Sequence, residues 1–87
     1  MAKYKIEIKK TAAKEIKKLP ANDLKKVLRL IDTLVENPRP AGCLKLSNDE
    51  KYRIRFVVYR LLYEIYDDRL LIIVVKVAHR KDVYRHS

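Results

Sequence analysis

The chain has 87 residues, of which 48% are hydrophobic, with one Gly, three Pro and a single Cys. This length and composition are typical of one compact domain, residues 1–87, and exclude a multi-domain enzyme or a long disordered tail. Cys43 cannot form an internal disulfide, and no Cys/His cluster has the spacing of zinc ligands. We therefore expect a reducing, cytoplasmic location, no structural metal and no cofactor.

The charge of the chain is strongly positive. Lys and Arg number 21 against 11 Asp and Glu, which gives a formal net charge of +10. Such an excess favours nucleic acid as a partner, then an acidic protein and then anionic lipid. Six of the nine basic residues after residue 50 are Arg, whose guanidinium matches phosphate oxygens better than an ammonium does. The binding site is therefore expected in this second segment.

The first predicted elements are a strand and a short helix. Apolar and charged residues alternate through residues 3–9, the pattern of a strand with one buried face. From Thr11, the expected N-cap, apolar residues follow helical spacing until Pro20 ends the segment. The several Lys residues of this segment then form a solvated helix face.

A longer second helix follows. Asn22 and Asp23 are the expected N-caps, and Asn37-Pro38 ends the helix. Between these limits the apolar residues recur at the spacing of one helix face; they are Leu24, Val27, Leu28, Ile31, Leu34 and Val35. Residues 37–42 hold the only Gly and two of the three Pro, so they are expected to connect a helical half to a strand half.

The second half of the chain predicts three strands. Residues 51–66 are too many for one ordinary strand, so a reversal is expected at Val57-Val58, with a new strand from Tyr59 to Ile65. Residues 66–69 predict a turn, and residues 70–77, apolar on both faces, predict a strand in the centre of the sheet. The longest apolar run is far shorter than the roughly 20 residues of a membrane span. The predicted fold is therefore α+β, β-α-α-β-β-β, with a helical hairpin packed on a mostly antiparallel sheet.

Five residues of the second half form the candidate site. Arg53 and Arg55 must share one face of a regular strand, Arg60 opens the next strand, Arg80 follows the last one, and Tyr84 lies four residues further on. The sequences Y-R-I-R (52–55), Y-R-L-L-Y-E-I (59–65) and H-R-K-D-V-Y (79–84), in this order and spacing, resemble the active-site pattern of RelE-type toxins. These toxins belong to the RelE/ParE superfamily of bacterial and archaeal toxin–antitoxin systems, and the resemblance covers essentially the whole chain.

The resemblance implies an endoribonuclease that enters the decoding site of the ribosome, cuts mRNA there and is inhibited by a RelB-like antitoxin. It places Arg53 and Arg55 where the family has basic residues that hold and activate the RNA backbone. It also places Arg60 and Arg80 at the phosphate-facing arginines and Tyr84 at the catalytic tyrosine. The expected partners are the antitoxin, the ribosome and mRNA, with no membrane.

The chemistry of the residues is compatible with this assignment. Cleavage by a 2′-OH group needs a base for the hydroxyl, cations for the developing charge on phosphate, and an acid for the leaving oxygen. Neighbouring guanidinium groups should lower the pKa of Tyr84, which would suit it to act as the base. The acid is left open between His79, His86 and a group of the ribosome. Cys43 is expected to be a small packed residue and not a nucleophile.

Two departures from the family pattern leave other functions open. Val57-Val58 replaces a Gly-Asp turn, and Ala78 replaces a Gly before the His-Arg pair. Because Val resists positive φ angles, the reversal is expected to shift or loosen and to move Arg60 relative to Arg55. The first alternative is a ParE-like inhibitor of DNA gyrase, against which the retained Arg and Tyr residues argue. The second is a decayed toxin that only binds nucleic acid or the antitoxin.

Overall fold

The computed structural model describes residues 3–46 and 51–79 and has an α+β fold, as predicted. Its five-stranded sheet has the order β1-β5-β4-β3-β2, and only the β1/β5 pair is parallel. The elements are β1 (Lys5–Ile8), α1 (Lys10–Lys17), α2 (Ala21–Glu36), β2 (Leu44–Lys45), β3 (Lys51–Phe56), β4 (Tyr59–Tyr66), the 3-10 turn η1 (Asp67–Arg69) and β5 (Leu71–His79).

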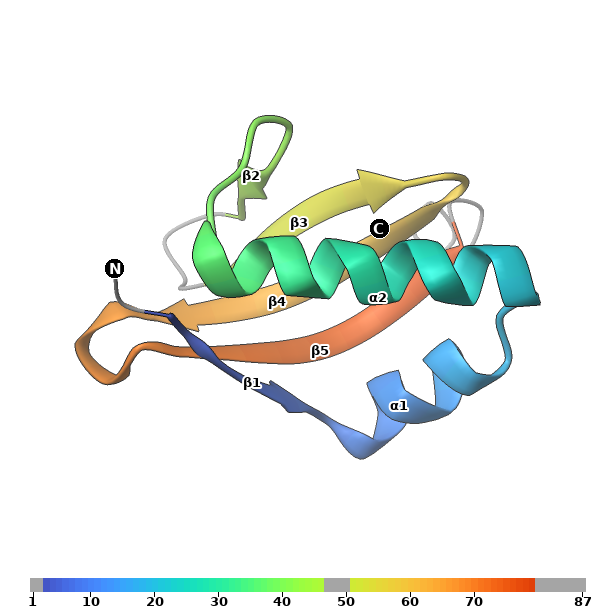
Figure 1. Ribbon diagram of the computed structural model, residues 1–87, viewed down its shortest axis with the longest axis horizontal. Coiled ribbons are helices and arrows are strands. Elements are labelled where there is room, and N and C mark those ends of the chain that lie inside the picture. Colours follow the sequence, from blue (N-terminus) through green and yellow to red (C-terminus); the bar gives the residue numbers. More distant parts are fainter. Residues whose placement is uncertain (1–2, 47–50, 80–87) are drawn as a thin grey trace.

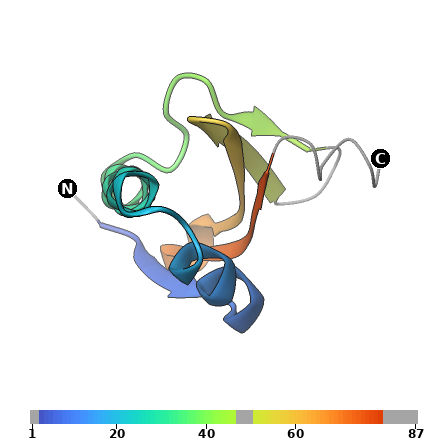
Figure 2. The same cartoon turned by 90° about the vertical axis from the view of Figure 1, so that its right-hand side faces the viewer.

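Both helices lie on the same side of the sheet. Figure 1 shows α2 crossing the sheet in front of β4 and β5, while α1 continues from the end of β1. In the perpendicular view of Figure 2 the strands curve around the helices, which leaves the outer side of the sheet without a helix in the described part of the chain. We call the two sides the helix face and the outer face.

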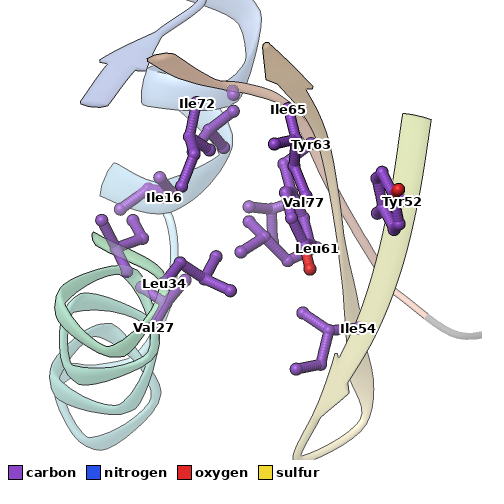
Figure 3. Close-up of a cluster of buried hydrophobic side chains, with 13 residues drawn as sticks. Ile16, Val27, Leu34, Tyr52, Ile54, Leu61, Tyr63, Ile65, Ile72 and Val77 are labelled. Atoms are coloured by element: carbon purple, nitrogen blue, oxygen red, sulfur yellow. The ribbon is translucent and has the colours of Figure 1, made fainter. Parts of the chain in front are cut away.

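The hydrophobic core fills the space between α2 and the helix face (Figure 3). Val27 and Leu34 of α2 are fully buried, as the helical spacing predicts, whereas Leu28, expected on the same face, is 48% exposed. Tyr52 and Tyr63, on neighbouring strands, stack with ring centroids 5.9 Å apart, so these two tyrosines pack in the sheet. The fully buried strand residues are Leu61, Tyr63, Ile65, Ile72 and Val74.

The predicted helix starts are wrong. Lys9 still donates its N–H to the Val74 carbonyl at 3.0 Å, so α1 begins directly after the strand at Lys10 and Thr11 is not its cap. The Pro20 carbonyl accepts the Leu24 N–H at 2.8 Å, which places the N-cap at Pro20. Asn22 and Asp23 therefore lie in the first turn of α2. There the negative charge of the Asp23 carboxylate interacts favourably with the positive end of the helix dipole.

The predicted reversals are confirmed. The chain turns at Val57-Val58 and again through η1, and β5 has strand neighbours on both sides, although β4 is the middle strand. Leu70, with φ 49°, still belongs to the turn, so β5 begins one residue later than predicted and extends to His79. The sequence did not predict β2, whose two residues pair with Arg53 and Tyr52 of β3.

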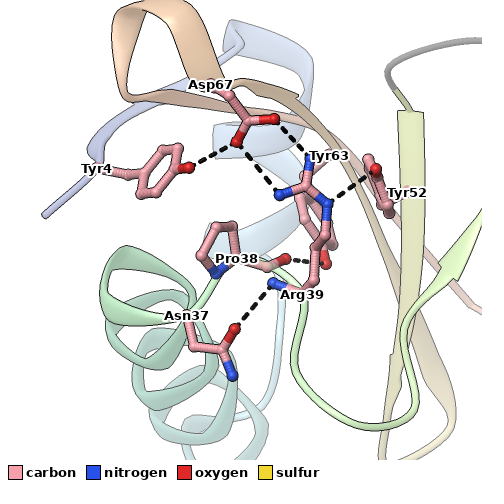
Figure 4. A network of polar contacts seen from close by, with 7 residues as sticks. All are labelled: Tyr4, Asn37, Pro38, Arg39, Tyr52, Tyr63 and Asp67. Carbon is pink, nitrogen blue, oxygen red and sulfur yellow. Dashed lines mark hydrogen bonds and ion pairs between the residues drawn. The ribbon is translucent and has the colours of Figure 1, made fainter. Parts of the chain in front are cut away.

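A polar network ties the connector after α2 to the turn before β5 (Figure 4). The Arg39 guanidinium donates two hydrogen bonds to the Asp67 carboxylate, at 2.8 and 3.2 Å, and its Nε donates to the Tyr52 hydroxyl at 3.0 Å. The Tyr4 hydroxyl donates to Asp67 at 2.6 Å. Hydrogen bonds from Arg39 and Tyr4 lower the pKa of Asp67, while the Asp67 carboxylate raises the pKa of Tyr4.

Candidate nucleic-acid interface

The arginines of β3 lie on the outer face, because the strand alternates. Tyr52 and Ile54 are buried beneath the helices, whereas Arg53 is half-buried and Arg55 is exposed. The prediction that the two arginines share one face is therefore confirmed by the regular pairing of β3 with β4. They project away from the core, on the side of the sheet that neither helix covers.

Arg60 joins them on the outer face. Its register partner in β3 is Arg55 and its partner in β5 is Ala78, and directly paired residues project from the same side of a sheet. Arg60 is only 6% exposed and Ala78 only 4%. The Arg60 side chain is therefore enclosed, and Ala78 is the smallest residue in the row of three paired residues that Arg55, Arg60 and Ala78 form. An exposed and a buried arginine therefore lie next to each other.

The expected displacement of Arg60 does not occur. Val57 adopts a φ of 54°, in the left-handed region, so the hairpin closes at the predicted residues and Arg55 still pairs with Arg60. The strain of the turn is carried by Val57, because a β-branched side chain disfavours positive φ. Ala78 lies within β5 and has no positive φ, so this replacement is accommodated without strain.

One basic residue of this face was missed by the sequence analysis. Lys76 pairs with Leu62, which pairs with Arg53, so these three residues form a row across the outer face. The Lys76 ammonium lies 3.5 Å from a carboxylate oxygen of Glu15 in α1. The sequence signal that could have placed Lys76 on this face is that it is the single charged residue in the otherwise apolar stretch 70–77.

His79 lies on the opposite side of the sheet from the arginines. Its register partner is Tyr59, the neighbour of Arg60 in β4, and the two rings meet edge to face at 5.5 Å. Burial raises the pKa of Tyr59, and the nearby carboxylate of Asp23 raises it further. The imidazole therefore packs at the helix-face end of the sheet, which disfavours His79 as the acid of a reaction on the outer face.

Three of the five predicted site residues, Arg53, Arg55 and Arg60, come together on the outer face. The predicted roles of Arg80 and Tyr84, and of His86 as an acid, lie outside the described residues. Within residues 3–46 and 51–79, no three His, Cys, Asp or Glu side chains gather closely enough to hold a metal ion. No helix in these same ranges has the length and apolar content needed to cross a membrane.

Comparison with known proteins identifies relatives over nearly the whole chain. Residues 6–84 match the family model described as the ParE toxin of the type II toxin–antitoxin system parDE. RelE1 of Methanocaldococcus jannaschii, whose toxin name is itself provisional, is 35% identical over 88 residues, which cover 97% of this chain and 98% of the relative. Toxin RelG of Mycobacterium tuberculosis is 31% identical over 84 residues, 94% of this chain and 97% of the relative.

Solved structures share the fold. RelE in the archaeal RelE–RelB complex from Pyrococcus horikoshii superposes with a TM-score of 0.83 at 27% identity, over 90% of this chain and 96% of the other. The RelB–RelE antitoxin–toxin complex from Methanococcus jannaschii gives a TM-score of 0.75 at 26% identity, over 92% and 96% of the two chains. The helical hairpin on a mostly antiparallel sheet is therefore the architecture of these relatives.

Proposed function

Because this chain belongs to the RelE/ParE family of toxins from type II toxin–antitoxin systems, we propose that it is an endoribonuclease that cleaves mRNA in the ribosomal A site. The observation that carries the proposal is the pairing of Arg55 with the buried Arg60 on the outer face. The proposed enzyme is a single cytoplasmic domain that acts only on ribosome-bound message.

The arginine pair favours an anionic ligand for an energetic reason. Like charges directly opposite each other destabilise a sheet, and enclosing a guanidinium group removes part of its hydration. An RNA phosphate beside Arg55 and Arg60 would lie against two guanidinium groups at once, and guanidinium groups bind phosphate oxygens through paired hydrogen bonds. Arg53 on the same strand would extend the contact along the RNA backbone.

The proposed roles follow the family resemblance. Arg53 and Arg55 hold and orient the RNA backbone, Arg60 and Arg80 stabilise the charge on the phosphate, and Tyr84 removes the proton of the 2′-OH. The 2′-oxygen then forms a bond to phosphorus while the bond to the 5′-oxygen of the next nucleotide breaks. The leaving oxygen takes a proton from His86 or from a ribosomal group, and the products are a 2′,3′-cyclic phosphate and a 5′-hydroxyl.

The proposed regulator is an acidic, RelB-like antitoxin. The solved relatives include RelE–RelB complexes from Pyrococcus horikoshii and Methanococcus jannaschii, which supports such a partner for this chain. An acidic partner would neutralise part of the +10 charge and block entry into the ribosome. Purified antitoxin should therefore abolish cleavage at a one-to-one ratio of binding sites.

A second candidate function is inhibition of DNA gyrase, because the matching family model bears the ParE name. Two parallel assays on purified protein separate the functions. In the first, end-labelled mRNA is incubated with and without programmed ribosomes, and the ends of any fragments are analysed. In the second, gyrase supercoils relaxed plasmid in the presence of the protein.

The proposed nuclease gives fragments with 2′,3′-cyclic phosphate ends only when ribosomes are present, and leaves supercoiling unchanged. Inhibited supercoiling with intact message would overturn the proposal in favour of the gyrase function. If the protein slows the migration of RNA in a native gel but neither cleaves RNA nor inhibits gyrase, it is a decayed toxin that only binds. A Tyr84→Phe variant should bind ribosomes as tightly as the wild type and yet leave the message intact.

A further inference from the structure

The last part of β5 extends beyond its parallel neighbour. The final register pair between β1 and β5 is Ile8 with Val74, and the chain then leaves the sheet to form α1. Among the residues that the structure describes, the remainder of β5, up to His79, therefore has no strand partner on that side. An unpaired backbone N–H at such an edge must find another acceptor or lose the energy of a hydrogen bond.

Glu15 of α1 supplies that acceptor. Its Oε1 accepts a hydrogen bond from the Val77 backbone N–H at 3.0 Å, in a place where a strand carbonyl would otherwise lie. Val77 is only 4% exposed, so water does not readily replace the carboxylate there. The other oxygen of Glu15 lies 3.5 Å from the Lys76 ammonium, which holds the carboxylate at the strand edge.

The hydrogen bond lies just after an irregularity in the sheet. Tyr63 pairs with Val74 but Leu62 pairs with Lys76, so Val75 has no register partner in β4. Before the bulge, even-numbered residues face the β1 side: the carbonyls of Leu70 and Val74 accept the N–H groups of Lys5 and Lys9. The extra residue of the bulge shifts this alternation by one, so that after it the odd-numbered Val77 directs its N–H to the same side. The contact with Glu15 thus belongs to the bulged register and would not form in a regular strand.

The bulge determines which residue lies beside Arg60. In the observed register this is Ala78, and a strand without the bulge would instead place Val77 opposite Arg60. A branched side chain at that position would occupy space that the enclosed Arg60 side chain now uses. Bulges commonly redirect side chains next to functional sites, and here the bulge determines the neighbour of the buried arginine.

We propose that Glu15 is a positioning residue that fixes the bulged register of β5 through the Val77 N–H and thereby keeps Arg60 in its place on the outer face. The inference rests on the proposed function only where it concerns cleavage. Glu15 itself lies on the helix side of the sheet and is assigned no contact with RNA. Its effect on the site passes through the backbone of β5.

The test compares Glu15→Gln with Glu15→Met. Both variants remove the charge and keep the length of the side chain, but only Gln retains an oxygen that accepts the Val77 N–H. Hydrogen exchange of the Val77 amide and the NOE contacts between Arg60 and Ala78 are measured by NMR. A Lys76→Met variant serves as the control for the ion pair and should retain slow exchange at Val77.

The expected result for Glu15→Met is exchange at Val77 faster by about tenfold or more, with weakened Arg60–Ala78 contacts and unchanged protection of Tyr63. Glu15→Gln should keep both signals. Equal Val77 protection in the two variants, or equal loss in both, would overturn the proposal. Glu15→Ala provides the same comparison with Gln if the Met variant does not fold.

Cleavage by the folded variants is measured in the same series. We expect Glu15→Met to lower the maximal cleavage rate about tenfold at unchanged half-saturating ribosome concentration, and Glu15→Gln to restore it to within about threefold. Unchanged cleavage by Glu15→Met despite an altered register would refute the link to the site. If the wild type cleaves nothing, the proposed function fails, and the NMR comparison still decides the structural role of Glu15.

Discussion

Arg55 and Arg60 lie directly opposite each other on β3 and β4, and one further pair, Phe56 and Tyr59, separates them from the Val57-Val58 stretch that reverses the chain. One of these arginines is exposed, whereas the other is 94% covered by its neighbours, since its exposed fraction is 6%. The pairing places two cationic side chains side by side on the same face as Arg53, and like charges opposite each other disfavour a sheet. This pairing can be tested separately for stability and for binding.

Replacing Arg55 with Gln should stabilise the protein and weaken its binding to RNA. Removing a like-charge pair should raise the free energy of unfolding by about 0.2–1 kcal/mol in a urea titration. The loss of one phosphate contact should reduce the salt slope of RNA affinity by about 0.7–1. Arg29→Gln, an equal loss of charge on the exposed surface of α2, is the control and should change neither quantity beyond error.

Replacing Val57 with Gly should stabilise the hairpin. The left-handed φ of 54° costs a residue with a Cβ about 1–2 kcal/mol, and Gly adopts it freely at an entropic cost of about 0.5–1 kcal/mol. The net gain in unfolding free energy should be about 0.5–1 kcal/mol by urea denaturation. Val58→Gly, at a neighbouring position without positive φ, should instead lower stability, and equal effects of the two changes would contradict the strain at Val57.

The Asp67 network should make stability depend on acid pH. The pKa of Asp67 is lowered by hydrogen bonds from Arg39 and Tyr4, so its contribution is complete above the pKa of an unfolded Asp, about 3.9. The contribution is lost as the pH falls through the lowered pKa. Because the carboxylate is about half exposed, Asp67→Asn should cost only about 0.5–1 kcal/mol at pH 7.

The difference between the wild type and Asp67→Asn should shrink when urea titrations are repeated at pH 2 to 3. A difference that stays constant from pH 7 to pH 2 would show that the carboxylate charge contributes nothing. The raised pKa of Tyr4 acts at the other end of the scale. Its contribution is complete below about pH 10 and is lost as the pH rises through the folded pKa.

Removing the Tyr63 hydroxyl should destabilise the fold without reducing RNA affinity. This hydroxyl donates a buried hydrogen bond to the Pro38 carbonyl at 2.8 Å, and burial raises the pKa of Tyr63, so the group stays protonated. Tyr63→Phe leaves a buried carbonyl without its donor and should cost about 1–3 kcal/mol in thermal or urea unfolding. Weaker RNA binding by the folded variant would indicate that Tyr63 acts beyond the core.

Periodicity in the sequence predicted the architecture well. The alternation around Arg53 and Arg55 correctly identified which residues face the core, and so did most of the apolar stripe of α2, because burial of apolar side chains determines both patterns; Leu28 is the exception, at 48% exposed. The reversal at Val57-Val58 was also located correctly. Its expected loosening was wrong, because pairing along the whole hairpin outweighs the strain of one valine.

Features that depend on contacts between distant segments were not predictable. The start of α1 depends on a hydrogen bond from Lys9 to Val74, and the two-residue β2 forms only beside β3. Lys76 appeared as one polar residue in an apolar strand, and the bulge at Val75 that sets its pairing has no local signal in the sequence. Arg80 and Tyr84 remain predictions from the family resemblance.

The most direct test of the central claim is the single-turnover rate of mRNA cleavage on programmed ribosomes, followed by primer extension, for Arg60→Gln beside Arg29→Gln. Both variants lose one positive charge, and near-UV circular dichroism establishes that each is folded. We predict that Arg60→Gln cuts about 100-fold more slowly or worse, while Arg29→Gln stays within about threefold of the wild type. Codon-phased cutting by Arg60→Gln at the wild-type rate would contradict the assignment of the outer face as the site of cleavage.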